Sequence, residues 1–179
     1  MKKILNNFLD QYMKAIKSDI DINMISDVAN YIDETVARNG KLIFAGNGGS
    51  AAMSSHVAVD FTKNAGIKSI NFNEADLITC FANDFGYENW VKEAINFYGS
   101  ENDLVFLISS SGNSMNMINA AKYCIKNDIK LVTLSGFNSN NKLRKLGKFN
   151  FWVDSSEYNI VEMTHHIILL LLVDGFINR

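Results

Sequence analysis

The chain has 179 residues, a formal net charge of −2 and 47% apolar residues. This apolar content excludes intrinsic disorder, and the length fits a single domain spanning residues 1–179. The slight acidity argues against a protein that holds nucleic acid through its phosphates, and the absence of proline excludes polyproline linkers.

The cysteines and the apolar runs predict a cytoplasmic protein without a membrane segment. Cys80 and Cys124 lie far apart, which fits a reducing compartment and argues against a disulfide scaffold or a structural zinc site. Polar residues interrupt the start Met1–Leu5 before a signal-peptide apolar region forms. The most apolar stretch, Ile167–Val173, is far shorter than the roughly 20 residues that a membrane span needs.

Two amphipathic helices are predicted over residues 1–40. Apolar residues recur there at three- and four-residue steps, the period of a helix with one buried face. Asn39–Gly40 is a typical end for the second helix, because glycine adopts the left-handed conformation that closes helices. The periodic residues are Leu5, Phe8, Tyr12 and Ile16 in the first helix and Ile25, Val28 and Ile32 in the second.

Residues 41–179 alternate apolar strands with helices. Continuous apolar strands separated by helices indicate a parallel sheet that is covered on both faces. We therefore predict an α/β fold, a three-layer αβα sandwich with a central parallel sheet, preceded by the two N-terminal helices. The expected strands lie at 41–45, 68–72, 103–108, 129–134 and 149–153, and the expected helices at 51–63, 87–97, 115–126 and 158–176.

A serine-rich loop, Ser109–Ser114, lies between a predicted strand and a predicted helix. Several hydroxyls beside the free N–H groups of a helix N-terminus form a cradle for a phosphate monoester, and the helix dipole attracts the anion. The loop has no lysine, which argues against a Walker-type triphosphate site. The alternative is an ordinary polar loop in which Ser114 caps the helix.

A glycine-rich loop, Gly46–Ser50, follows the first predicted strand. Its glycines permit close approach of a ligand to the backbone, although the loop lacks the GxGxxG spacing of a dinucleotide site. Parallel sheets bind ligands at the carboxyl ends of their strands. Two such loops at that edge favour a ligand site more strongly than either loop alone.

Two sets of residues with ionisable side chains lie outside these loops. His56 and Asp60 are four residues apart on a predicted helix and share a face, as a catalytic pair, two metal ligands or a solvated surface pair. Asn83–Gly86 has a turn signature that contains the acidic Asp84, again with a structural or a catalytic interpretation.

The last predicted helix carries the third ionisable group. Glu162 lies three and four residues before His165 and His166, so that it can share a helix face with either histidine. Histidine is the side chain best suited to proton transfer near neutral pH.

In combination and order, these motifs resemble the SIS (sugar isomerase) domain, and more closely the phosphoheptose isomerase group. The likeness covers nearly the whole chain: two leading helices, Gly46–Ala52 with His56 downstream, Asn83–Gly86, Ser109–Ser114, and a last helix with Glu162. Members of that group interconvert sedoheptulose 7-phosphate and a heptose 7-phosphate. The resemblance implies a flavodoxin-like sandwich and a role in making surface-polysaccharide precursors.

The resemblance also implies a set of substrate-binding residues. The serines of the loop would hold the sugar phosphate, the glycine-rich loop would contact the sugar, and Asp84 would line the site. The set comprises Asn47, Gly48, Ser50, Asp84, Ser109, Ser110, Ser111, Ser114 and Glu162.

The catalytic pair of the resembled group is altered in this chain. Isomerisation through an enediol needs a base at the carbon proton and an acid at the carbonyl oxygen. The position of the family's glutamate base holds Asp60, and the position of its histidine acid holds Leu169. We therefore expect Asp60 as base and either His165 or His166, about one turn from Leu169, as acid.

Zinc is expected to be absent. In family members with zinc, a glutamine and a histidine of the last helix join the histidine and glutamate of the earlier helix as ligands. The first two positions hold Val161 and Leu169 here, so that His56 and Asp60 remain only as weak candidate ligands. We expect no cofactor.

Two functions remain open on the sequence. The first is an aldose–ketose isomerase that acts on a phosphorylated sugar. The second is a non-catalytic SIS protein that binds a sugar phosphate or a protein partner, an alternative that explains the lost histidine. A DNA-binding SIS regulator is disfavoured because the residues before Lys41 are too few and insufficiently basic for a DNA-binding domain.

A second subunit is also expected. Ile167–Leu172 is apolar on all sides of the last helix, and part of such a surface in a small domain meets another chain. The resemblance implies a homotetramer whose active sites combine residues of neighbouring subunits.

Overall fold

The computed structural model describes all residues from 1 to 179 and contains one five-stranded parallel sheet in the order β2-β1-β3-β4-β5. This is the strand order of flavodoxin-like proteins, with the change of winding direction between β1 and β3. The predicted α/β class and parallel sheet are confirmed. The strands are β1 (Leu42–Gly46), β2 (Ser69–Asn71), β3 (Leu104–Ser109), β4 (Lys130–Ser135) and β5 (Phe149–Trp152).

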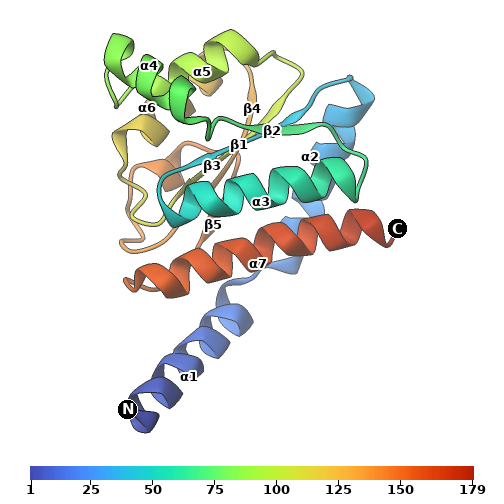
Figure 1. The fold of residues 1–179 in the computed structure, drawn as a ribbon. Coiled ribbons are helices and arrows are strands. Elements are labelled where there is room, and N and C mark those ends of the chain that lie inside the picture. Colours follow the sequence, from blue (N-terminus) through green and yellow to red (C-terminus); the bar gives the residue numbers. More distant parts are fainter.

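Helices cover both faces of the sheet, as Figure 1 shows. On one face lie α2 (Ile22–Ala37), α3 (Gly49–Lys63) and α7 (Tyr158–Ile177). On the other lie α5 (Trp90–Tyr98) and α6 (Met115–Lys126), with α4 (Ala75–Phe85) packed on α5. Alternate residues of β1, β3 and β4 enter the two cores, and both cores are apolar. This explains the continuous apolar strands of the sequence.

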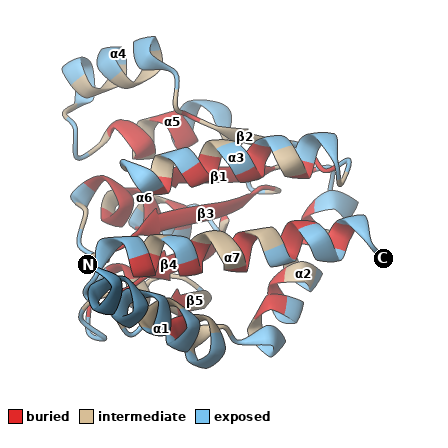
Figure 2. Cartoon of the chain, turned by 60° about the horizontal axis from the view of Figure 1, so that its bottom comes forward, coloured by how far each residue is buried: buried red, intermediate tan, exposed pale blue.

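The two N-terminal helices differ in how they pack. Asp21 caps α2 by accepting hydrogen bonds from two backbone N–H groups of its first turn, and α2 enters the core. Helix α1 (Lys2–Asp19) contacts α7 but buries only Ala15, and it projects from the body (Figures 1 and 2). Most of its apolar face therefore lacks a partner within the chain. The exposed apolar residues of α1 are Ile4, Leu5, Phe8, Leu9 and Met13.

The segment between β2 and β3 differs from the prediction. We expected a turn at Asn83–Gly86 and one helix at 87–97, whereas the structure has α4 before Gly86 and α5 after it. Gly86 ends α4 with a φ of 83°. No residue of α4 is fully buried, as its tan and pale blue colouring in Figure 2 shows, but Leu77, Ile78, Phe81 and Ala82 recur at helical spacing on its half-buried face, a period that the sequence analysis did not use.

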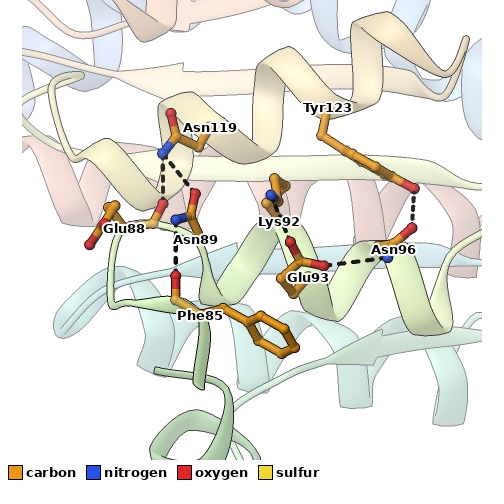
Figure 3. A network of polar contacts seen from close by, with 8 residues as sticks. All are labelled: Phe85, Glu88, Asn89, Lys92, Glu93, Asn96, Asn119 and Tyr123. Atoms are coloured by element: carbon orange, nitrogen blue, oxygen red, sulfur yellow. Dashed lines mark hydrogen bonds and ion pairs between the residues drawn. The ribbon is translucent and has the colours of Figure 1, made fainter. Parts of the chain in front are cut away.

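A polar network fixes α5 against α6 (Figure 3). The side chain of Asn119 donates to the carbonyl of Glu88 and to the side chain of Asn89, and the Tyr123 hydroxyl donates to Asn96. Asn89 in turn donates to a carbonyl in the last turn of α4. The network holds the α4–α5 connection to α6, the helix that follows the serine loop.

Helix α7 has the length and composition of a membrane-spanning helix, although the sequence pattern predicted none. Half of its most apolar window is buried inside the protein, where it packs against α1, α2 and α3. A buried core helix has the same composition as a membrane span, so that the apolar character of α7 does not indicate a membrane protein.

Candidate phosphosugar site

A cavity of about 270 Å³ opens at the carboxyl ends of β1 and β3. It lies between the β1–α3 loop and the β3–α6 loop, where the winding direction of the sheet changes and where open parallel sheets bind ligands. The structure gathers eight of the nine predicted substrate-binding residues in this cavity. They are Asn47, Gly48, Ser50, Ser109, Ser110, Ser111, Ser114 and Glu162.

The serine loop presents hydroxyls at the N-terminus of α6. Ser114 precedes the helix, but its side chain makes no capping hydrogen bond and instead accepts one from the Ser109 hydroxyl at 3.1 Å. Gly112 turns the loop with a φ of 63°. The backbone N–H of Met117 donates to the Asn116 side chain, and the remaining N–H groups at the start of α6 can hold an anion together with the hydroxyls.

Asn47 ties the glycine-rich loop to α6. Its side-chain amide exchanges two hydrogen bonds with the amide of Asn116, at 3.1 and 2.9 Å, and it also accepts one from the Tyr87 hydroxyl. Gly48 has a φ of 56° and a ψ of −122°, a combination that non-glycine residues rarely adopt. The two loops of the cavity are thus fixed relative to each other.

Glu162 brings the only carboxyl group to the cavity lining. Its carboxylate lies directly over Gly49 at the start of α3, in space that any larger residue at position 49 would fill. Burial raises the pKa of this carboxyl above its ordinary value, and a hydrogen bond with the Ser110 side chain opposes that rise.

His56, Asp60 and His166 form a second group on the surface of α3 and α7. His56 Nε2 lies 3.2 Å from Asp60 Oδ2, and His56 Nδ1 lies 3.0 Å from His166 Nε2. Burial lowers the pKa of His166, the neighbouring His56 lowers it further, and Asp60 raises it. None of the three lines the cavity of the same chain. Asp60 lies ten residues beyond Ser50, or about 15 Å along the helix axis.

His165 and Asp84 belong neither to the cavity lining nor to the His56 group. His165 is fully buried, and its Nε2 lies 3.0 Å from the carbonyl oxygen of Ser135. Burial lowers the pKa of His165 to about 4, so that its ring is neutral near pH 7. Asp84 is exposed in the last turn of α4 and interacts with Cys80 and Asn83.

Three residues that the sequence analysis did not single out also line the cavity. They are Gly49, Ile108 and Tyr158. Tyr158 is the first residue of α7, and its ring packs edge-on against Phe137. The glycine-rich loop predicted that Gly49 lies at the site, whereas nothing in the sequence marked Tyr158.

The four zinc-ligand positions of the resembled family do not fit a metal here. His56 and Asp60 are adjacent, but both ring nitrogens of His56 already face side-chain partners. Val161 and Leu169 are apolar and fully buried, and no three His, Cys, Asp or Glu side chains of the chain are arranged to hold a metal.

Comparisons with known proteins agree with the fold and the loops. Residues 6–136 match the SIS domain. The phosphoheptose isomerase of Aneurinibacillus thermoaerophilus is 32% identical over 173 residues, which cover 90% of this chain and 87% of that protein. The phosphoheptose isomerase of Helicobacter pylori is 27% identical over 179 residues, which cover 97% and 88%.

A solved structure has the same fold over its full length. The phosphoheptose isomerase of Francisella tularensis superposes with a TM-score of 0.89 at 20% identity, covering 99% of this chain and 98% of that one. The predicted three-layer sandwich with two leading helices is confirmed. This chain belongs to the SIS domain family, and the relatives named above are phosphoheptose isomerases.

Proposed function

We propose that the chain is an aldose–ketose isomerase for a phosphorylated sugar, and that it interconverts sedoheptulose 7-phosphate and a heptose 7-phosphate for surface-polysaccharide precursors. The observation that carries the proposal is the cavity between the two loops, which holds four serines at a helix N-terminus. The identity of the substrate is inferred from the relatives that are named phosphoheptose isomerase. The reaction takes place in the cytoplasm, without a metal cofactor.

Proton transfer is assigned to the group on α3 and α7. Asp60 offers a carboxylate, and His166 offers an imidazole that lies against His56. His165 is not retained as the acid, because its ring is fully buried and already bonded to the main chain. The phosphate is assigned to the serine loop, with Glu162 and Asn47 beside the sugar.

The enzyme acts as a homotetramer whose active sites lie between subunits. Two observations support this assembly: the proton-transfer group lies outside the cavity of its own chain, and α1 exposes an apolar face. A neighbouring subunit that covers these surfaces would bring its own cavity to the histidines.

A turnover assay with sedoheptulose 7-phosphate tests the reaction. The wild-type enzyme should form heptose 7-phosphate, and Asp60→Asn should reduce kcat by about 100-fold or more, the usual contribution of a general base. Asp174→Asn, an exposed change on α7, serves as the control and should retain activity. Equal trace rates for wild type and Asp60→Asn would exclude the isomerase.

Mixed oligomers test the shared site. A double variant, Ser111→Ala with Ser114→Ala, loses the phosphate cradle, and Asp60→Asn loses the carboxylate. Each should be inactive alone, but mixing the two chains should restore activity, because some interfaces then join an intact cradle to an intact proton-transfer group. Mixtures that form oligomers yet stay inactive would contradict a site between subunits.

A second candidate is a non-catalytic protein that binds a sugar phosphate or a protein partner. The buried Leu169 and Val161, at the positions of the family's acid and glutamine, favour it. It predicts that a sugar phosphate raises the melting temperature, that the double serine variant abolishes this rise, and that no product forms.

A further inference from the structure

The cavity presents a carboxyl group to a ligand that is itself an anion. Glu162 is its only carboxyl group, and no lysine, arginine or histidine lines it. Charge on a bound phosphate would therefore be balanced only by serine hydroxyls, backbone N–H groups and the dipole of α6. A carboxylate in the same space opposes that binding.

The carboxylate of Glu162 lies so that any ligand that fills the cavity contacts it. Its carboxylate lies between the two loops, over Gly49 on one side and beside the Ser110 side chain on the other. A phosphate in the serine cradle therefore comes to lie beside this carboxylate. Like charges that lie side by side disfavour each other's ionised forms, and because the N–H groups and hydroxyls of the cradle stabilise the charged phosphate, the proton goes to the carboxyl group.

The other titratable groups near Glu162 do not supply a compensating cation. Tyr158 is the one further titratable side chain of the lining. His166 follows one turn later on α7, where it faces His56 and Asp60 of α3. The serine loop contributes no charge, and His165 behind it is buried and bonded to Ser135.

We propose that Glu162 couples phosphate binding to proton uptake. When a phosphate monoester enters the cavity, the carboxylate takes one proton from solvent, and the resulting O–H group donates a hydrogen bond to a phosphate oxygen. This inference takes from the proposed function only that the ligand carries a phosphate group. It does not require that the protein catalyses isomerisation. The protonation state of Glu162 would then depend on whether an anion occupies the cavity.

Burial of Glu162 before ligand binding supports the direction of this coupling. The pKa of the carboxyl is already raised by its surroundings, so that less free energy is needed to protonate it when the anion arrives. The Ser110 hydroxyl, which can both donate and accept, can turn from the carboxylate toward the phosphate at the same step.

Calorimetry with glucitol 6-phosphate tests the proposal, because this polyol phosphate has no carbonyl to isomerise. At pH 8 the phosphate is a dianion, its second pKa being about 6. Titration in two buffers of different ionisation enthalpy should show the uptake of nearly one proton per site by the wild-type protein. The Kd of the wild-type protein for glucitol 6-phosphate should then increase by about tenfold per pH unit above neutrality.

The Glu162→Gln variant keeps the shape of the side chain and an N–H donor but cannot titrate. It should take up no proton, bind with an affinity independent of pH, and bind more tightly than wild type at pH 8.5. Asp174→Asn, exposed on the same helix and outside the cavity, should behave as wild type.

Several results would overturn the proposal. It fails if wild-type binding exchanges no protons, if Glu162→Gln retains the uptake, or if no polyol phosphate binds. The first of these results comes from the wild-type protein alone, so that the proposal can be refuted without a folded variant. Turnover of sedoheptulose 7-phosphate without proton-linked binding would refute this inference and leave the isomerase standing, whereas proton-linked binding without turnover would do the reverse.

Discussion

The buried His165 makes the stability of the fold depend on pH. Its ring has no exposed surface, Nε2 faces the carbonyl of Ser135, and Nδ1 has no hydrogen-bond partner. Because a carbonyl only accepts hydrogen bonds, Nε2 carries the proton and Nδ1 the buried lone pair. Acidification perturbs this residue by placing a second proton, and a charge, in the apolar interior.

The magnitude follows from the displaced pKa of His165. Burial lowers that pKa from 6.5 to about 4, while the bond with Ser135 opposes the change. Between these values the unfolded chain binds the proton and the folded chain does not, so that the free energy of unfolding decreases as the pH falls. Each pH unit corresponds to about 1.4 kcal/mol, and the whole interval to about 3 kcal/mol. Above pH 6.5 this contribution is complete.

Urea denaturation at pH 4, 5, 6 and 7, followed by circular dichroism at fixed protein concentration, measures the effect. The control variant is His165→Gln, whose side-chain N–H can replace the Nε2 donor but does not titrate. All other acid-sensitive groups are common to both proteins, so that the difference between the two curves isolates His165. A difference that stays constant from pH 7 to pH 4 would refute the reasoning.

Three further predictions concern single residues. The buried carboxylate of Asp103 accepts hydrogen bonds from the backbone N–H and the ammonium group of Lys41 and from the backbone N–H of Ser100. Asp103→Ala removes this acceptor, and urea denaturation should show that the free energy of unfolding falls by about 2–3 kcal/mol. Gly112→Ala forces a Cβ into the Asn141 side chain at a φ of 63°, so that the melting temperature should fall and phosphate-induced stabilisation should disappear; an unchanged ligand response would contradict this. Burial raises the pKa of the Cys124 thiol to about 12, so that iodoacetamide at pH 8 should label only the exposed Cys80 in the folded protein and both thiols after unfolding, as counted by mass spectrometry.

Features that depend on neighbouring residues in the chain were predicted from the sequence. The serine loop and the glycine-rich loop each follow a strand and precede a helix, and parallel strands necessarily bring such loops to one edge. Seven of the nine proposed substrate-binding residues belong to these two units and meet in one cavity for this reason, and Glu162 of α7 joins them there. Asp84 does not line the cavity, because its side chain is exposed in the last turn of α4, although Tyr87 just beyond that helix donates to Asn47.

Features that depend on helix packing were not predictable. His165 and His166 are adjacent in sequence and equally suited to proton transfer, but the rotation of α7 against α3 and β4 buries the first and places the second beside His56. No local pattern determines this rotation. The extra helix α4 is a different case, because the helical spacing of Leu77, Ile78 and Phe81 is visible in the sequence and the interpretation of Asn83–Gly86 as a turn passed over it.

The position of α7 in the chain has a consequence for synthesis. This helix leaves the ribosome after all the other helices and strands of the fold, yet it completes the core that α2 and α3 share, and it supplies the surface on which α1 rests. Until about residue 176 is available, the apolar faces of α2 and α3 remain uncovered and open to aggregation. A premature stop before Tyr158 would therefore yield an insoluble fragment rather than a smaller working enzyme.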